Sequence, residues 1–271
     1  MTAILITEAL AQMGEAGARL DEIQSCEAGA GNISFALREC CGLDEAFPNQ
    51  EAYTLPAAVA SLAGWTVLVT GSGRRLRDIG RDPGAAVAAV TVGADGSSGT
   101  LRFADTRAWK APSSEFNSHL AVHSDQVSRN PGLTRHVVVH AQPIHLVALS
   151  HVDAFRDSRV FTKRIIRWEP ETIVQLPDGL EVLDFMVPGS DTLQQGSVAG
   201  LRDHRIVVWS KHGVMVRHDT SPLGAVDLIE YAETGARYDH LNTIAGNPSE
   251  GLSDSELRAV VAAFNVQTTL V

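Results

Sequence analysis

The sequence predicts an α/β protein in which helices cover a mixed or largely antiparallel sheet. Segments with apolar residues at helical spacing fall between short runs of apolar and β-branched residues, which indicates that both element types share a core. Several expected strands are separated only by turn residues, as at Asp95-Gly96, and such short links join antiparallel neighbours. A doubly wound parallel sheet would need a long crossover after each strand. Hydrophobic residues make up 44% of the 271 residues and charged residues 20%, so the chain can bury a sizeable core.

Apolar periodicity and helix-opening residues predict the helices. Apolar side chains repeat at helical spacing from Ile4 to Ile23. Residues 113–127 are expected to form a helix opened by Pro112 or Ser113, and Pro143 is expected in the first turn of the next helix. The last helices expected are residues 223–241 and 253–264. We expect a single domain over residues 1–271, with an N-terminal helix inside 1–25 and a C-terminal helix inside 250–271.

Short apolar and β-branched runs bounded by glycine or proline predict the strands. They are, in chain order, residues 33–37, 65–70, 87–92, 99–103, 135–140, 172–176, 180–185, 206–209 and 214–217. Two hairpins are expected, one around Asp95-Gly96 and one around Pro177-Asp178-Gly179. Residues 40–55 show neither period and are expected to be an irregular loop.

The charge balance argues against two classes of partner. The net charge is −10, from 22 basic and 32 acidic residues. The densest basic cluster is short and consists of Arg74, Arg75 and Arg77. Binding to nucleic acid or to an anionic membrane surface is therefore not expected.

The cysteines indicate reduced thiols and a cytoplasmic protein. There are three, Cys26, Cys40 and Cys41, and this odd count without CxxC spacing fits neither a disulfide framework nor a thiolate zinc site. The first residues carry Glu8 and Glu15 without a basic start, so no signal peptide is expected. No apolar run reaches the length of about 18 residues that a membrane span needs.

Two histidines, His140 and His212, follow apolar runs that are expected to be buried strands. Ligands converge at strand ends, neutral imidazoles suit Zn²⁺, and the glycine after His212 lets the chain turn close to a metal. Gln142 lies on the same strand face as His140 but offers only an oxygen, and His145 could reach the same pocket. The alternative is that these are hydrogen-bonded histidines of an ordinary core. The other histidines are expected to be surface or helix residues, namely His119, His123, His151, His204, His218 and His240.

Two loops have the residue types that bind an anionic group. Ser113, Ser114 and Glu115 would open a helix, where free N–H groups and hydroxyls suit a phosphate and a carboxylate could act as a base. The alternative is that Glu115 only caps the helix and favours its dipole. The loop from Thr70 to Gly73 follows a strand and could be a phosphate nest or a plain tight turn, and it lacks the ending of a Walker loop.

Five short motifs, taken together and in order, resemble the class II aldolase/adducin family. They are Gly31-Asn32-Ile33-Ser34, Val69-Thr70-Gly71-Ser72-Gly73, Ser113-Ser114-Glu115, His140 with Gln142, and Lys211-His212-Gly213. The segment from Val160 to Asp191 resembles the branch of that family that cleaves L-rhamnulose 1-phosphate. The resemblance covers about residues 25–240.

The resemblance implies a three-layer α/β/α fold, a mainly antiparallel central sheet and a homotetramer. It implies a metal-dependent aldolase that cleaves a ketose 1-phosphate, such as L-rhamnulose 1-phosphate, to dihydroxyacetone phosphate and an aldehyde. Zn²⁺ or another divalent metal would be held by His140, Gln142 and His212, and Glu115 would be the catalytic base. The substrate phosphate would be held by Asn32, Ser72, Gly73, Ser113 and Ser114.

Gln142 departs from the family pattern, which has a second histidine at this position. The Gln142 carbonyl could ligate the metal and favour a harder cation, or His145 could take the ligand's place. A third possibility is that the site holds no metal and the chain is a non-catalytic, adducin-like scaffold. A sugar-phosphate 4-epimerase of the same fold is a further alternative, because it shares the cleavage step and then recombines the fragments.

Overall fold

The computed structural model describes residues 3–246 and 249–271 of the chain. Nine of the strands in these residues form one sheet. They are β2 (Asn32–Leu37), β4 (Asn49–Thr54), β5 (Thr66–Thr70), β6 (Val87–Val92), β7 (Ser98–Phe103), β8 (Arg135–Ala141), β9 (Leu180–Leu183), β10 (Ile206–Trp209) and β11 (Gly213–His218). Their order across the sheet is β4-β7-β6-β5-β2-β8-β11-β10-β9, and every neighbouring pair is antiparallel except β9 and β10. The expectation of a mainly antiparallel sheet is confirmed.

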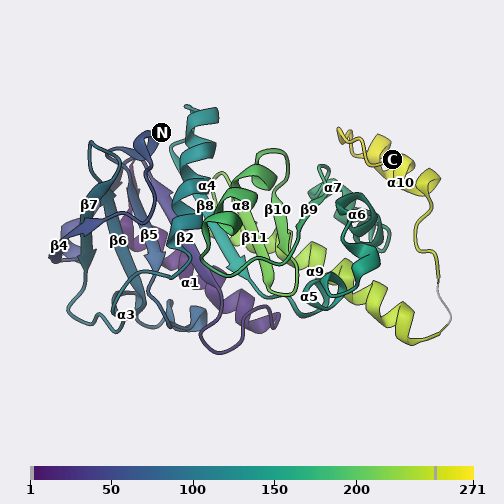
Figure 1. The fold of residues 1–271 in the computed structure, drawn as a ribbon, viewed down its shortest axis with the longest axis horizontal. Coiled ribbons are helices and arrows are strands. Elements are labelled where there is room, and N and C mark those ends of the chain that lie inside the picture. Colours follow the sequence, from purple (N-terminus) through teal and green to yellow (C-terminus); the bar gives the residue numbers. More distant parts are fainter. Residues whose placement is uncertain (1–2, 247–248) are drawn as a thin grey trace.

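Helices cover both faces of this sheet and give three layers (Figure 1). The helices are α1 (Ile6–Glu22), α2 (Leu43–Ala46), α3 (Pro83–Ala86), α4 (Phe116–Arg129), α5 (Ile144–Ser150), α6 (Ser158–Ile166), α7 (Pro170–Gln175), α8 (Asp191–Asp203), α9 (Pro222–Ile244) and α10 (Asp254–Ala263). β1 (Ile4–Leu5) and β3 (Cys40–Cys41) form a separate two-stranded parallel sheet. The expected α/β/α fold is therefore confirmed.

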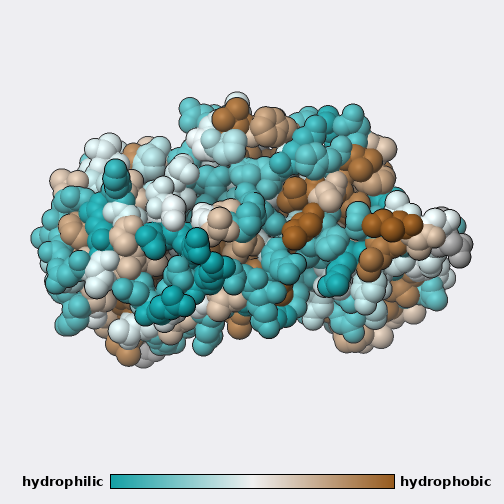
Figure 2. Space-filling view, turned by 90° about the horizontal axis from the view of Figure 1, so that it is seen from below, coloured by the Kyte–Doolittle hydropathy of each residue, from teal (hydrophilic) through white to brown (hydrophobic). Residues whose placement is uncertain are grey.

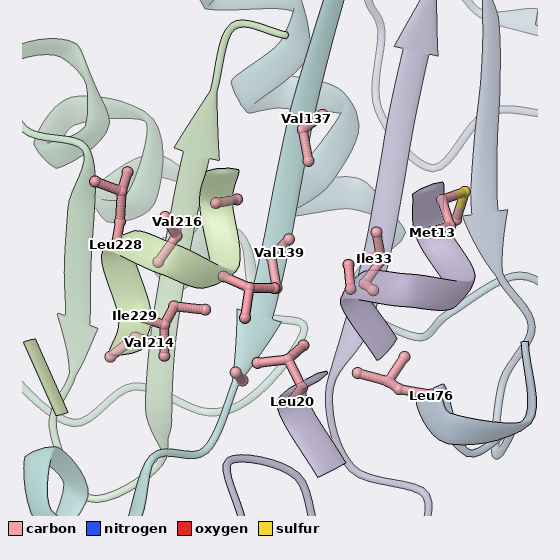
Figure 3. Packing of buried hydrophobic residues seen from close by; sticks show 14 of the residues in the cluster. Met13, Leu20, Ile33, Leu76, Val137, Val139, Val214, Val216, Leu228 and Ile229 are labelled. Atoms are coloured by element: carbon pink, nitrogen blue, oxygen red, sulfur yellow. The ribbon is translucent and has the colours of Figure 1, made fainter. Parts of the chain in front are cut away.

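One face of the sheet packs against α1 and α9. Figure 3 shows Met13 and Leu20 of α1 near Ile33, and Leu228 and Ile229 of α9 beside the strand β11. These side chains are almost completely buried, and each contributes roughly 1.5–3 kcal/mol through the hydrophobic effect. Because strand side chains alternate, Ile33 and the other odd-numbered residues of β2 face this layer.

The opposite face packs against α4 and α8. Leu120 of α4 lies in a cluster with Val67 and Val69 of β5. Val122 of α4 and Leu193 of α8 lie in a second cluster with strands β8, β10 and β11. The even-numbered residues of β2 face this layer, and two of them, Asn32 and Ser34, are polar although buried. This layer therefore holds polar groups inside the protein, and the candidate site is built from some of them.

The expectation of an irregular loop over residues 40–55 is wrong in part. This stretch contains β3, α2 and β4. β4 pairs only with β7, so it is an edge strand of the large sheet, and most of its residues are exposed. An exposed edge strand needs no apolar alternation, so the sequence lacked the signal that identifies a strand.

The expected hairpin around Pro177-Asp178-Gly179 is also wrong. Its first strand is the helix α7, which begins at Pro170, and its second strand, β9, pairs in parallel with β10. Thr172 and Ile173 are β-branched and suggested a strand, but both are buried, and Ile173 packs in a cluster with Ile166 and Leu257. Tertiary packing outweighs the local preference here.

The surface is unevenly apolar. The view from below shows hydrophobic side chains gathered over the half of the molecule that carries α5, α6 and α9, while the other half is mostly hydrophilic (Figure 2). The exposed apolar side chains of α5 and α9 are Ile144, Leu223, Tyr238, Leu241 and Ile244. Among the described residues, no helix has the length and hydropathy that crossing a membrane requires.

Candidate metal centre

Three side chains from separate parts of the chain meet at one end of the polar layer. They are Glu115 at the start of α4, His140 in β8 and His212 in the turn between β10 and β11. Their ligand atoms all lie within 4.8 Å of one another. The Glu115 carboxylate is 3.6 Å from His140 Nε2 and 3.7 Å from His212 Nε2. The structure thus brings together three of the residues that the sequence motifs singled out.

The sheet register sets the positions of these groups. β8 lies between β2 and β11, so Asn32 is directly opposite His140 on one side and Met215 on the other. The β10–β11 turn passes close to His140, and a Cβ atom on Gly213 would lie 2.7 Å from His140 Cε1 and 2.4 Å from the Ala141 carbonyl oxygen. A glycine is therefore required at position 213 for the turn to reach the histidine.

The Glu115 side chain is directed into the protein and makes no capping hydrogen bond to the helix. The helix begins at Phe116 rather than at Ser113, and Glu115 is the N-cap residue without a side-chain capping hydrogen bond. The residue is 5% exposed, and its Oε2 accepts a hydrogen bond of 2.8 Å from Asn32 Nδ2. The side chain therefore bonds to Asn32 and makes none of the capping hydrogen bonds that the alternative interpretation expected. The carboxylate is available to a cation or to a substrate proton.

The hydrogen bonding of His140 leaves one ring nitrogen free to act as a ligand. Its Nδ1 lies 2.9 Å from the Val214 carbonyl oxygen. A carbonyl only accepts hydrogen bonds, so Nδ1 carries the hydrogen and Nε2 presents its lone pair. A backbone partner of this kind fixes the ring orientation of metal-binding histidines.

His212 is also suited to bind a cation. Burial, with help from the neighbouring His140 and against the opposing effect of Glu115, lowers the pKa of His212 to about 4. The ring is therefore neutral near pH 7, which a metal ligand requires. Two imidazoles and a carboxylate on three separate elements fit Zn²⁺ or a similar divalent cation, and three protein ligands leave a position open for substrate.

Gln142 and His145 each have an acidic partner outside the cluster of three. Gln142 lines a cavity of about 780 Å³ together with His212, and its amide group faces Glu27. His145 Nδ1 is 2.6 Å from Glu233 Oε1, and its ring lies beside His240. His145 is paired with Glu233, so the structure does not support His145 as a replacement metal ligand.

Four of the five residues expected to bind phosphate lie on two adjoining loops. The Ser72 N–H donates to the Ala111 carbonyl at 2.9 Å, and the Ser113 N–H donates to the Thr70 carbonyl at 3.0 Å. These two N–H groups are therefore used by the backbone and are not free for an anion. Ser72, Gly73 and Ser114 are exposed and Ser113 is half-buried. The fifth residue, Asn32, is buried and bonded to Glu115.

A chain of buried histidines lies next to the candidate site, and the sequence interpretation missed it. Ser34 Oγ lies 2.6 Å from His119 Nδ1 and 2.7 Å from His123 Nε2, and His123 Nδ1 lies 2.7 Å from His136 Nδ1. His119 and His123 were expected to be surface or helix residues, and they are on α4 but completely buried. Their spacing of four residues, which places both on one face of the helix beside apolar neighbours, is the signal that could have found them.

Burial keeps these histidines uncharged. It lowers the pKa of His119 and of His123 well below the ordinary value, and nearby histidines add to the effect. Burial, with a contribution from Arg217 and His218, lowers the pKa of His136 to about 3. Neutral imidazoles can each donate one hydrogen bond and accept another. The buried histidines can therefore stay hydrogen-bonded to one another without a buried charge.

Comparisons with known proteins point to one family. The model of the family described as Class II Aldolase and Adducin N-terminal domain matches residues 11–240. A rhamnulose-1-phosphate aldolase of Klebsiella pneumoniae is 31% identical over 213 residues, which cover 79% of this chain and 76% of that protein. A protein of the same name from Bacteroides thetaiotaomicron is 28% identical over 242 residues, covering 89% of this chain and 88% of that protein.

Solved structures show the same fold. A sugar-phosphate aldolase from Thermotoga maritima superposes with a TM-score of 0.74 at 24% identity, covering 91% of this chain and 99% of that one. An L-fuculose 1-phosphate aldolase superposes with a TM-score of 0.58 at 16% identity, covering 95% of this chain and 96% of that one. The family match extends over most of the chain, from α1 into α9. The chain belongs to the class II aldolase and adducin N-terminal domain family.

Proposed function

We propose that this chain is a metal-dependent aldolase that reversibly cleaves a ketose 1-phosphate, such as L-rhamnulose 1-phosphate, to dihydroxyacetone phosphate and an aldehyde. The observation that carries the proposal is the cluster of Glu115, His140 and His212, which lies within the matched family region. Relatives about 30% identical that bear the name rhamnulose-1-phosphate aldolase support the substrate class.

His140, His212 and Gln142 would hold Zn²⁺ or another divalent cation. His140 Nε2 and His212 Nε2 both lie within 4 Å of the Glu115 carboxylate, so Glu115 can complete the set while no substrate is present. A bound divalent cation supplies Lewis-acid stabilisation of the negative charge that develops on a substrate oxygen when the carbon–carbon bond breaks. The buried setting strengthens this electrostatic effect because little water screens it.

Glu115 would be the base that moves a proton on the three-carbon fragment. The hydrogen bond from Asn32 occupies Oε2, and Oε1 is left facing His212. Asn32 therefore fixes the direction of the carboxylate while one oxygen stays available. A base held in this way within reach of the substrate typically contributes a factor of about 10²–10⁴ in rate.

The substrate phosphate would be held by Asn32, Ser72, Gly73, Ser113 and Ser114. The backbone bonds that join the two loops place the hydroxyl groups of Ser72 and Ser113 on neighbouring segments. Since the N–H groups of these two serines are used within the backbone, we infer that their hydroxyls are the donors to the phosphate. Asn32 would link the phosphate end of the substrate to Glu115.

The cleavage reaction is tested first with the variant Glu115→Gln. We expect its rate of cleavage of L-rhamnulose 1-phosphate to fall by about 10²–10⁴, because an amide cannot accept the proton. Release of dihydroxyacetone phosphate is measured with a coupled dehydrogenase. Glu8→Gln, an exposed change of the same kind on α1, serves as the control.

Several outcomes would contradict the proposal. Full activity in Glu115→Gln would remove this residue as the base. An epimer in place of released fragments would identify the 4-epimerase alternative. A wild-type chain that retains no metal after incubation with zinc or manganese would favour the adducin-like scaffold.

A further inference from the structure

Gln142 and Glu27 form a hydrogen-bonded pair in the cavity beside the candidate metal centre. One end of the Gln142 amide lies 3.0 Å and 2.5 Å from the two carboxylate oxygens of Glu27. Glu27 lies in the segment after α1, and both residues line the cavity that also contains His212. The proposed function uses Gln142 but gives no role to Glu27.

This pairing fixes which end of the amide faces which way. An ionised carboxylate only accepts hydrogen bonds, so the nitrogen of Gln142 must point to Glu27. The amide oxygen lies on the other branch of the same planar group and therefore points away from Glu27. Without Glu27, the two ends of the amide would be almost equivalent in shape and either could turn toward a cation.

The Gln142 side chain lies next to the histidines of the centre. A Cβ atom built on Gly213 would lie 2.7 Å from His140 Cε1 and 3.3 Å from Gln142 Cγ, so the ring and the glutamine stem border the same small space. Gln142 also lines the same cavity as His212. The Gln142 stem therefore lies beside the space that His140 borders, and its amide contacts Glu27 at the other end.

We propose that Glu27 is a positioning residue that holds the Gln142 amide so that its oxygen, and not its nitrogen, is offered to the metal. The proposal rests on the proposed function, because it assumes a cation at His140 and His212. A charge-assisted hydrogen bond to the amide nitrogen draws electron density toward the oxygen and makes it a better donor. Glu27 would act on the metal only through Gln142.

The other acid in the cavity provides a matched control. Asp21 Oδ1 accepts a hydrogen bond of 2.8 Å from Arg77 Nη1, and both residues line the cavity. Asp21 carries the same charge as Glu27 but pairs with an arginine in place of the amide. Substituting Asp21→Asn removes one negative charge from this cavity without touching the Gln142 contact.

The test measures the affinity of the folded chain for Zn²⁺ and Mn²⁺ by competition with a chromophoric chelator. We expect Glu27→Gln to weaken Zn²⁺ binding by about 10–100-fold, the usual effect of removing an outer partner of a metal ligand. Asp21→Asn should change the affinity by less than about threefold, since it alters only the local charge. Urea unfolding of each variant confirms that the fold is intact.

A double substitution separates positioning from general electrostatics. When Gln142→Ala has removed the amide, Glu27→Gln should weaken binding no more than Asp21→Asn does, because Glu27 no longer has a ligand to orient. An equal loss from Glu27→Gln with or without Gln142 would overturn the proposal, and so would equal effects of Glu27→Gln and Asp21→Asn. Failure of the wild-type chain to bind either cation would overturn the proposed function as well, so the two failures are distinguishable.

Discussion

At the scale of single residues, the candidate centre depends on a few side chains whose direction is set by one contact each. Asn32 directs Glu115, and the Val214 carbonyl directs His140. The sequence motifs identified Glu115 and His140, because their residue types and family pattern are visible in the chain. The sequence could not show that Glu115 turns away from its helix, since this depends on Asn32, which is 83 positions away.

Substitution of Gly213 tests how closely the candidate metal centre is packed. We expect Gly213→Ala to displace His140 or the β10–β11 turn, because the added methyl carbon would lie 2.4 Å from the Ala141 carbonyl oxygen and 2.7 Å from His140 Cε1. Strain of this kind typically costs about 1–3 kcal/mol of stability. Urea unfolding and Zn²⁺ affinity would both be measured, and both should decrease.

Gly80→Ala provides the comparison for this change. A Cβ atom on Gly80 would meet its nearest neighbour at 3.8 Å, which is ordinary contact. This variant should keep the wild-type stability and affinity within about 0.5 kcal/mol. If Gly213→Ala behaved in the same way, the β10–β11 turn would not constrain the metal centre.

At the scale of elements, burial and strand pairing determine which helices and strands could be predicted from the sequence. The strands β5, β6, β8 and β10 are buried and rich in β-branched residues, and they were predicted close to their observed bounds. The edge strand β4 lacks an apolar pattern, and α7 carries a strand-like sequence that its packing converts to a helix. In both cases the missing information lies in the neighbours of the element and not in its own residues.

The histidine chain that joins α4 to β2 and β8 predicts a loss of stability in acid. Its histidines have pKa values below that of an unfolded histidine, so the unfolded state binds more protons once the pH falls below about 6.5. Stability is therefore fully present above that pH and decreases as the pH falls toward about 3, the pKa of folded His136. Each histidine contributes up to about 1.4 kcal/mol per pH unit in this range.

Urea unfolding at about pH 8 and about pH 5 measures this effect. His136→Gln removes one titrating ring and keeps a group that can bond to His123, so its stability should depend less steeply on pH than that of the wild-type chain. His151→Gln changes an exposed histidine and should leave the dependence unaltered. Identical pH dependences for His136→Gln and the wild type would show that the buried histidines do not cause the loss of stability in acid.

At the scale of the whole molecule, the layered fold followed from the sequence pattern, but its assembly did not. That residues 1–271 form a single domain stays a prediction. The homotetramer expected from the family also stays a prediction, and the exposed apolar side chains of α5 and α9 give it a physical basis (Figure 2). A patch that covers these helices would be buried if copies of the chain associate through them.

Light scattering coupled to size exclusion tests the assembly directly. We expect a mass of about four times the 29.0 kDa of the chain. Dilution to nanomolar concentration should lower the mass if the contact is reversible. A mass of one chain at all concentrations would contradict the homotetramer.

The centre is assembled from segments that are far apart in the chain, and this sets an order for its appearance during synthesis. Glu115, His140 and His212 lie on α4, on β8 and in the turn before β11, and β11 pairs directly with β8. A growing chain has the carboxylate and the first imidazole long before it has the second. The cation site therefore cannot exist until the ribosome has released the chain beyond His212 and β11 has closed against β8. A cation that binds then stabilises only chains in which this pairing has formed, so the metal would favour chains that extend through β11 over shorter ones.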